Sequence, residues 1–295
     1  MNENEIEWLA ECFERHRPHL RAVAYRMLGS LAEADDAVQD AWLRLSQSKA
    51  DEIDNLGGWL TTVVARECLH MLRRRRLRRE DALAAHLPDP IIVPDRDLDP
   101  EQQALLADSV GLALLVVLDS LTPAERLAFV LHDMFELPFD EIAPMVGRTP
   151  TAARQLASRA RRRVKGAGIP APDPDLTRQR AVVDAFFSAS RAGDFDALIQ
   201  VLDPDVRLRV DFGPSRPPAL IRGVSAVAKL ARAPRGADLH PALVNGMVGA
   251  VITLNGRPSS VLAFTVANDK IVEIDGIGDP ARVRRIAAAV LTGLA

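Results

Sequence analysis

Polar and basic side chains recur along one face of a predicted helix that begins near Trp59. Their spacing follows the helical repeat, and the row consists of Thr62, Arg66, His70 and Arg73. Hydroxyl, guanidinium and imidazole groups in such a row suit hydrogen bonds to phosphates and to base edges. The basic run 73–80 continues the row, and alone it would also fit non-specific phosphate binding or a solvated helix end. His70 has no partner ligand nearby, so no metal site is expected.

A second basic helix is predicted over 150–164, with Thr149 as its N-cap and Pro150 in its first turn. Its apolar residues share one side of the helix. They are Ala153, Leu156, Ala157, Ala160 and Val164. The other side carries Thr151, Arg154, Gln155, Ser158, Arg159 and Arg162.

The residues before this helix have the pattern of a helix-turn-helix. One helix starts at Thr122, with Glu125 completing a capping box, and a short helix over 138–147 ends at Gly147. In such a motif, residues near the start of the second helix contact base edges, and later arginines contact phosphates. A plain helical hairpin with a basic surface stays open as an alternative.

An acidic amphipathic helix is predicted over 31–45, with Ser30 as its N-cap and Glu33 at the capping-box position. Its apolar stripe consists of Leu31, Ala34, Val38, Ala41, Trp42 and Leu45. The opposite face carries Asp36, Gln39, Asp40 and Arg44. Without further context, such a helix is typical of a solvated surface.

Charge is segregated along the chain, although the net charge is only −3. Segments 55–80 and 148–177 each carry seven basic and two acidic residues, whereas 81–147 carries two basic and 13 acidic residues. We therefore expect two local anion-binding surfaces and not a uniformly cationic protein.

Length and composition exclude several classes of protein. With 295 residues, 48% hydrophobic and 26% charged, the chain is expected to form roughly two globular domains. The longest apolar run, 110–118, is too short to cross a bilayer, and the acidic N-terminus has no signal core. Cys12 and Cys68 cannot form a disulfide framework, so we expect buried thiols and a cytosolic protein without cofactor.

The two basic modules together resemble regions 2 and 4 of a bacterial RNA polymerase sigma factor of the extracytoplasmic-function type. The resemblance rests on 33-EADDAVQDAWLRL-45, 58-GWLTTVVARECLHMLRRRR-76 and 121-LTPAERLAFVLHDMFELPFDEIAPMVGRTPTAARQLASRARRRVK-165. It implies an alternative sigma factor, and not an enzyme, that binds core RNA polymerase, directs it to promoters and helps to melt the −10 region.

The resemblance also implies three contact surfaces. The acidic helix would dock on the clamp helices of the polymerase β′ subunit through Asp36, Gln39, Asp40, Trp42 and Leu43. The −10 element would be read and opened by Asn55, Trp59, Thr62, Val63, Arg66, His70, Arg73 and Arg74, with loop 51–58 helping to capture a flipped base. The −35 element would meet Thr151, Arg154, Gln155, Ser158, Arg159 and Arg162, and the β flap is a further expected partner. Many relatives carry an asparagine at the position of Arg66, and an arginine there would recognise different base edges.

A further domain is predicted after the Gly- and Pro-rich linker 166–175. Helices are expected at 178–190 and 194–202. Strands follow at 206–210, 249–254, 260–266 and 270–277, with Asn255-Gly256 and Asn268-Asp269 as hairpin turns. This order indicates an α+β domain with a curved sheet. It resembles the SnoaL-like branch of the NTF2-like fold, a cone-shaped domain with a pocket, which sigma-J-like sigma factors carry.

The expected fold class is therefore multi-domain, with two all-α sigma domains and one α+β NTF2-like cone domain. The sigma domains are the region 2 helical bundle and the region 4 helix-turn-helix. The expected boundaries are 1–81 for region 2, 82–111 for an acidic, proline-containing linker, 112–166 for region 4, 167–177 for a second linker and 178–295 for the SnoaL-like regulatory domain.

The sigma-J-like group has three short motifs that this chain carries in altered form. Its Trp-Leu-Pro-Glu-Pro linker motif appears as 86-HLPDP-90, its DGGGK stretch as 211-DFGPSR-216 and its NPDKL ending as 278-GDPARV-283. The resemblance implies regulatory roles for Leu87, Pro88, Asp89, Pro90, Asp211, Asp279 and Pro280. We hypothesise that the tail packs on the linker and on region 2 or 4, and so sets whether the two DNA modules can spread over the polymerase.

Other functions stay open from the sequence. A self-standing repressor or activator would use the helix-turn-helix without polymerase, but it would need neither the acidic helix at 33–45 nor the basic helix at 59–76. An NTF2-like enzyme fused to a DNA-binding module would use Asp205, Asp211 or Asp275 as a general base, although a fold alone does not establish an activity. A small ligand in the pocket of the tail is a further alternative.

Overall fold

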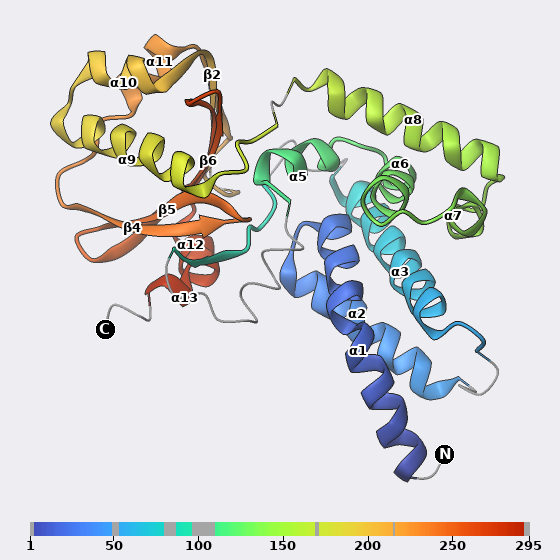
Figure 1. Cartoon of the computed structure of the whole chain (residues 1–295). Helices are drawn as coiled ribbons and strands as arrows, with labels where there is room; N and C mark the ends of the chain where they lie inside the picture. Colours follow the sequence, from blue (N-terminus) through green and yellow to red (C-terminus); the bar gives the residue numbers. More distant parts are fainter. Residues whose placement is uncertain are drawn as a thin grey trace. The chain divides into compact units, whose positions relative to one another are not determined.

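The structure, a computed structural model, describes residues 3–48, 53–79, 87–95, 110–168, 171–214 and 216–291. It divides into two compact units, each built from two separate stretches of the chain. The first, called the helical unit, comprises Met1–Leu83 and Leu115–Gly168, and the second, called the sheet unit, comprises Ala84–Leu114 and Ile169–Ala295. Figure 1 shows both with the element labels used below.

Three helices form the first half of the helical unit, namely α1 (Glu3–Leu28), α2 (Leu31–Gln47) and α3 (Leu56–Arg79). The predicted apolar stripe of α2 is confirmed by the burial of Ala34, Val38, Ala41 and Leu45. The Ser30 hydroxyl accepts a hydrogen bond from the backbone N–H of Glu33, as predicted for an N-cap. The Glu33 carboxylate pairs with Arg75, which ties the start of α2 to α3.

Helix α3 begins at Leu56, three residues before the expected start. Asn55 accounts for the earlier start, because its side-chain oxygen accepts from the N–H of Gly58 at 3.0 Å and its carbonyl accepts from the N–H of Trp59 at 3.0 Å. The first turn contains two glycines, which have low helix propensity, and the sequence pattern therefore predicted a later start for this helix.

The second half of the helical unit is a helix-turn-helix. Helix α5 (Leu112–Asp119) leads into α6 (Pro123–Phe129), which continues as the π-helical turn η2 (Val130–Met134). The predicted capping box between Thr122 and Glu125 is confirmed. Helix α7 (Phe139–Val146) ends at Gly147 with a left-handed φ of 67°, and α8 (Pro150–Gly166) follows with Thr149 as its N-cap.

A buried arginine joins the two halves of the helical unit. Arg126 of α6 is 2% exposed, and its Nε and Nη2 donate to the carbonyl of Arg26, at the end of α1, at 3.2 and 3.1 Å. Its Nη1 pairs with Asp119 at 3.2 Å. Burial lowers the pKa of Arg126 to about 10, because removal from water disfavours the charged form. Arg126 therefore fixes α6 against the bundle of α1, α2 and α3.

The described residues of the sheet unit form a seven-stranded sheet in the order β1-β4-β5-β6-β7-β2-β3. The strands are β1 (Ile92–Pro94), β2 (Leu202–Asp211), β3 (Ala219–Arg222), β4 (Ala237–Val244), β5 (Met247–Leu254), β6 (Arg257–Ala267) and β7 (Lys270–Ile277). Strands β5 to β7 form an antiparallel meander, as expected, and β4, which the sequence did not predict, pairs antiparallel with β5 and extends it. Strand β2 runs parallel to β7. The turns at Asn255-Gly256 and Asn268-Asp269 are confirmed by positive φ at all four residues.

Helices cover this sheet on both faces. Helices α9 (Leu176–Ala192), α10 (Phe195–Val201) and α11 (Val224–Leu230) lie on one side, and α12 (Pro280–Ile286) and α13 (Ala288–Leu291) lie on the other (Figure 1). Phe264 of β6 packs against Phe186 and Phe187 of α9, with ring centroids 5.3 and 5.4 Å apart. These rings anchor the predicted tail helix to the sheet.

A strand from the expected linker completes the edge of the sheet. Strand β1 pairs antiparallel with β4, with Ile92 opposite Val244. The sequence predicted only a linker over 82–111, because a strand of three residues, one of them a proline, is too short to show an alternating pattern. Pro94 fits an edge strand, where one side needs no N–H donor. His86 and the stretch 96–109 lie outside the described residues.

Within the described ranges, no helix combines the length and apolarity needed to cross a membrane. Over those same residues, no group of three or more His, Cys, Asp or Glu side chains could hold a metal ion. Cys12 and Cys68 are buried free thiols, as expected, and burial raises the pKa of Cys68.

Candidate nucleic-acid interface and linker contacts

The predicted row on α3 is open to solvent. Its exposed members are Arg66, His70, Arg73 and Arg74, and its half-buried members are Trp59, Thr62 and Val63. The next arginine along the helix, Arg75, points inward, where it pairs with Glu33 and donates to the carbonyl of Leu28 at 2.9 Å. The helix thus separates arginines that stabilise the bundle from arginines that can reach a polyanion.

Two predicted −10 residues also serve the fold of α3. Asn55 caps its first turn, and the Thr62 hydroxyl donates to the carbonyl of Gly58 at 2.9 Å. An alanine at Asn55 would therefore loosen the start of the helix as well as remove any base contact.

The six predicted −35 residues lie together on the exposed side of α8. They are Thr151, Arg154, Gln155, Ser158, Arg159 and Arg162. On the opposite side, Ala153, Ala157 and Ala160 are buried. The Arg154 guanidinium lies over the ring of Phe139 in α7, 5.3 Å from its centroid, which restricts where this side chain can point. The sorting of the helix into two faces matches the sequence pattern.

Glu125 connects the capping box of α6 to α8. Its carboxylate accepts from the N–H of Thr122 at 3.1 Å and pairs with Arg159 and Arg163, each at 3.0 Å. Burial opposes the charge of Glu125, but hydrogen bonds from Thr122 and Arg159 outweigh it and hold the pKa of Glu125 below its ordinary value. Arg159 is therefore engaged inside the helix-turn-helix, whereas no described carboxylate pairs with Arg162.

The exposed acidic side of α2 also includes an apolar side chain, Leu43, toward the C-terminal end of the helix. Asp36, Gln39 and Asp40 are exposed, and Leu43 is 47% exposed. Trp42 is half-buried, with its ring 5.2 Å from that of Phe13. Acidic groups beside an exposed leucine suit a partner surface that is basic with an apolar centre.

Five residues of the sheet unit form a group that we call the linker clamp: Leu87, Asp89, Asp211, Arg282 and Arg285. Arg282 pairs with Asp89 at 2.5 Å and with Asp211 at 2.7 Å, and it donates to the carbonyl of Leu87. The N–H of Leu87 donates to Asp211 at 2.8 Å, and Arg285 pairs with Asp89 at 2.8 Å. The three altered motifs singled out in the sequence therefore meet at one place.

The remaining predicted linker and tail residues support the linker clamp. Asp279 caps α12 by accepting from the N–H of Arg282 at 2.9 Å, and Pro280 occupies the first turn of that helix. Pro90 is buried and Pro88 is half-buried. Gly213 has a φ of 77°, and a Cβ there would lie 2.1 Å from Asp279, so this close approach requires glycine.

Further contacts hold the segment 87–95 on the sheet. The N–H of Ile91 donates to the side chain of Asn245 at 2.6 Å, and Arg180 of α9 makes a two-pronged pair with Asp95 at 2.5 and 2.8 Å. The sequence did not indicate these roles for Arg282, Arg285, Asn245 and Arg180. Of these, Arg282 lies inside the motif 278–283, and its charge opposite that of Asp89 was a signal for the pairing.

The three carboxylates that the sequence offered as general bases do not line a cavity of the sheet unit that could hold a substrate. Asp211 belongs to the linker clamp, Asp205 is exposed on β2, and Asp275 lies 3.6 Å from Arg209. A cavity of about 500 Å³ lies in the sheet unit, and none of these three residues lines it. Their geometry gives no support to a role in acid–base chemistry in that cavity.

Asp275 makes the stability of the sheet unit depend on pH. Burial raises its pKa from 3.8 to about 7, against the opposing charge of Arg209 and with the nearby charge of Glu273 adding to the rise. Between about pH 4 and pH 7, the folded chain keeps a proton that the unfolded chain loses, so the free energy of unfolding falls as pH rises through this window.

We expect Asp275→Asn to remove this dependence. Relative to the variant, the native protein should lose about 2–3 kcal/mol of unfolding free energy between pH 5 and pH 8. Urea unfolding followed by circular dichroism at both pH values measures the difference. Parallel pH profiles of the two proteins would contradict the assignment.

Each half of the helical unit matches a known protein family. Family models for Sigma-70 region 2 and for Sigma-70, region 4 match residues 12–78 and 111–164. The ECF RNA polymerase sigma factor SigJ of Mycobacterium tuberculosis (strain ATCC 25618 / H37Rv) is 38% identical over 286 residues, which cover 91% of each protein. The crystal structure of M. tuberculosis SigJ matches with a TM-score of 0.73 at 33% identity, over 92% of this chain and 97% of that one.

Structural neighbours of the sheet unit include an NTF-2 like protein of unknown function from Burkholderia xenovorans LB400. This match has 23% identity and a TM-score of 0.28, and it covers 35% of this chain and 84% of that one.

Regions 2 and 4 on one chain define a sigma factor, the class of protein that recognises promoters for RNA polymerase. Within that class, the chain belongs to the extracytoplasmic-function (ECF) family. The expected family and the expected fold class are confirmed, and a repressor or activator that acts without polymerase is not supported.

Proposed function

We propose that the sheet unit regulates this sigma factor by holding the segment that connects region 2 to region 4. One observation carries the proposal. Arg282 joins Leu87 and Asp89 of the connecting segment to Asp211 of β2. Because the two regions must take up separate positions on a promoter, a restraint on the chain between them limits the positions that they can reach together.

Burial supports a lasting contact and not a passing one. Leu87, Ile91, Ile92 and Val93 are each less than 8% exposed. Covering such side chains contributes about 1.5–3 kcal/mol each relative to leaving them in water. The segment 87–95 is therefore part of the folded sheet unit, and its release requires a signal, a partner or a change in sequence.

Run-off transcription with purified core RNA polymerase tests the proposal. We expect a higher rate from protein lacking residues 178–295 than from the full chain, because regions 2 and 4 can then separate freely. The deletion also uncovers the apolar residues of β1, so full-length Arg282→Ala serves as a second, milder release. Unchanged transcription in both variants would reject regulation by the sheet unit.

The proposal includes specific contacts for the three surfaces. Asp36, Gln39, Asp40, Trp42 and Leu43 would bind the β′ clamp helices of the polymerase. The exposed row of α3, with Asn55 and Trp59 at its start, would contact the −10 element, and α8 would contact the −35 element. Support comes from the position of these side chains on single helix faces, where each is exposed or half-buried, and from the family match over both regions.

Two arginines of α8 should behave differently at the −35 element. Arg154, near the start of the helix, is expected to contact base edges, so Arg154→Ala should cost about 1–3 kcal/mol at one or two base pairs only. Arg162, three turns from the start, is expected to contact phosphate, so Arg162→Ala should weaken all sequences alike and reduce the salt dependence.

Holoenzyme binding to promoters with single −35 substitutions, measured at two salt concentrations, separates these outcomes. Uniform loss of affinity in both variants would mean that the orientation assigned to α8 is wrong.

A further inference from the structure

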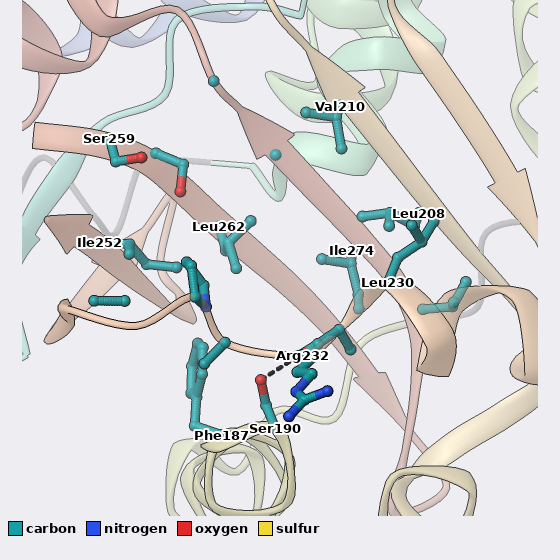
Figure 2. A pocket seen from close by; sticks show the side chains of 18 of the residues that line it. Phe187, Ser190, Leu208, Val210, Leu230, Arg232, Ile252, Ser259, Leu262 and Ile274 are labelled. Atoms are coloured by element: carbon teal, nitrogen blue, oxygen red, sulfur yellow. Dashed lines mark hydrogen bonds between the residues drawn. The ribbon is translucent and has the colours of Figure 1, made fainter. Parts of the chain in front are cut away.

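A cavity of about 500 Å³ lies between the sheet and the helices α9 and α11 of the sheet unit. Figure 2 shows Leu262 and Ile274 of the strands on the side facing Phe187 and Ser190 of α9. Cavities of this volume are typical of sites for small organic molecules. All the residues that line it come from the sheet unit, so its shape depends on one folded unit alone.

The walls of the cavity are apolar but not closed. Several lining side chains on central strands are only half-buried, namely Leu208, Val210, Leu239, Ile252 and Leu262. Leu230 of α11 is 59% exposed. Covering apolar surface of this kind is favourable by about 25 cal/mol per Å². The cavity therefore favours a ligand with a large apolar body.

Positive charge gathers around the same cavity. Arg191, Arg216 and Arg232 line it and are exposed, and none of them pairs with a carboxylate among the described residues. Arg216 lies over the ring of Phe212, 4.1 Å from its centroid. Asp238 is the only carboxylate among the described lining residues, and it too is exposed. The excess of guanidinium groups attracts an anion.

The polar groups of the lining suit binding better than catalysis. The Ser190 hydroxyl is occupied, because it donates to the carbonyl of Ala231 (Figure 2). Ser259 and Ser260 add half-buried hydroxyls. Among the described lining residues there is no His, Cys, Lys, Glu or Tyr, and Asp238 is exposed, so none of them is a buried general base.

We infer that this cavity binds a small organic anion with a large apolar body, whose acidic group lies at the arginines. Phenyl and aliphatic side chains cover the body of the ligand, and Arg232, beside the end of α9, provides a cation at the cavity edge. The inference does not depend on the proposed regulation, because it concerns binding by the sheet unit alone.

Two fluorescent probes with nearly the same apolar body test this inference on the full-length protein. 8-Anilinonaphthalene-1-sulfonate carries a sulfonate, and N-phenyl-1-naphthylamine is its neutral analogue. We expect saturable binding of one sulfonate probe per chain and weaker binding of the neutral probe. An exposed charge pair contributes up to about 1 kcal/mol, so Arg232→Gln should weaken the sulfonate probe by about two- to fivefold. The control Arg235→Gln lies in the same exposed loop but outside the lining, and it should leave binding unchanged.

A second variant fills the cavity itself. Ile252→Trp places an indole ring in the space, and we expect it to weaken both probes by at least about tenfold while circular dichroism stays native. Undiminished sulfonate binding in Ile252→Trp would place the site elsewhere and overturn the inference. Equal effects of the Arg232 and Arg235 substitutions, or equal affinity for the two probes, would overturn the anionic character of the ligand. If Ile252→Trp fails to fold, the comparison of Arg232→Gln with Arg235→Gln still tests whether the sulfonate probe binds at this cavity.

Discussion

Arg282→Ala is expected to release the segment 87–95 from the sheet unit and to lower the free energy of unfolding of that unit by about 3–5 kcal/mol. The Arg282 side chain is 13% exposed and faces Asp211, which is 1% exposed. Removing the cation takes the paired charge away from this buried carboxylate, to which the N–H groups of Leu87 and Gly213 still donate. Hydrogen exchange measured by mass spectrometry should show loss of protection across 87–95.

Arg285→Ala is the matched control for this experiment. Arg285 pairs with the same Asp89, but its side chain is 68% exposed, so its removal should cost less than about 1 kcal/mol. Exchange at 87–95 should then stay close to that of the native protein. Retained protection in Arg282→Ala, or equal losses in the two variants, would show that the linker clamp does not hold the segment.

Arg126→Ala is expected to destabilise the helical unit by about 3–5 kcal/mol. The substitution removes a side chain that is 2% exposed, breaks its pair with Asp119 and leaves the carbonyl of Arg26 without two of its donors. The contact between α6 and the end of α1 should open before the helices themselves melt, because each half of the unit keeps its own apolar core. Hydrogen exchange at the end of α1, together with urea unfolding followed by tryptophan fluorescence, measures both effects.

Arg161→Ala provides the comparison for Arg126. Arg161 lies in the same helix-turn-helix and pairs with Asp133 at 3.5 Å, but its side chain is 42% exposed. Its removal should change the unfolding free energy by less than about 1 kcal/mol. A similarly small effect of Arg126→Ala would mean that the two halves of the helical unit are held by apolar packing alone.

Features with local signals could be predicted from the sequence. The capping box at Thr122, the left-handed stop at Gly147 and the two faces of α8 each depend on residues within one or two helical turns. The turn at Asn255-Gly256 has the same character, because two adjacent residues determine it. The faces of the candidate DNA-binding helices followed directly from such local patterns.

Features that depend on distant partners could not be predicted in the same way. Arg282 and Asp89 are 193 residues apart, and Arg126 and Arg26 are 100 residues apart. Arg126 does not differ in its local sequence from a solvated surface residue, and for Arg282 the motif 278–283 drew attention to the segment without identifying its partner. Strand β1 is too short for a pattern, and it becomes a strand only because β4 offers an unpaired edge.

Because β1 precedes region 4 while its partner β4 lies near the end of the chain, the order of synthesis matters for this protein. Ribosomes add about 5–20 residues per second, so the apolar residues Ile91, Ile92 and Val93 wait roughly 8–30 s for β4 to be made. During that interval the nascent chain already contains region 2 and the helix-turn-helix but has an uncovered hydrophobic strand between them. Protein that ends after region 4 would keep these apolar residues uncovered, so we expect the gain in transcription from the shortened chain only in its soluble, monomeric fraction.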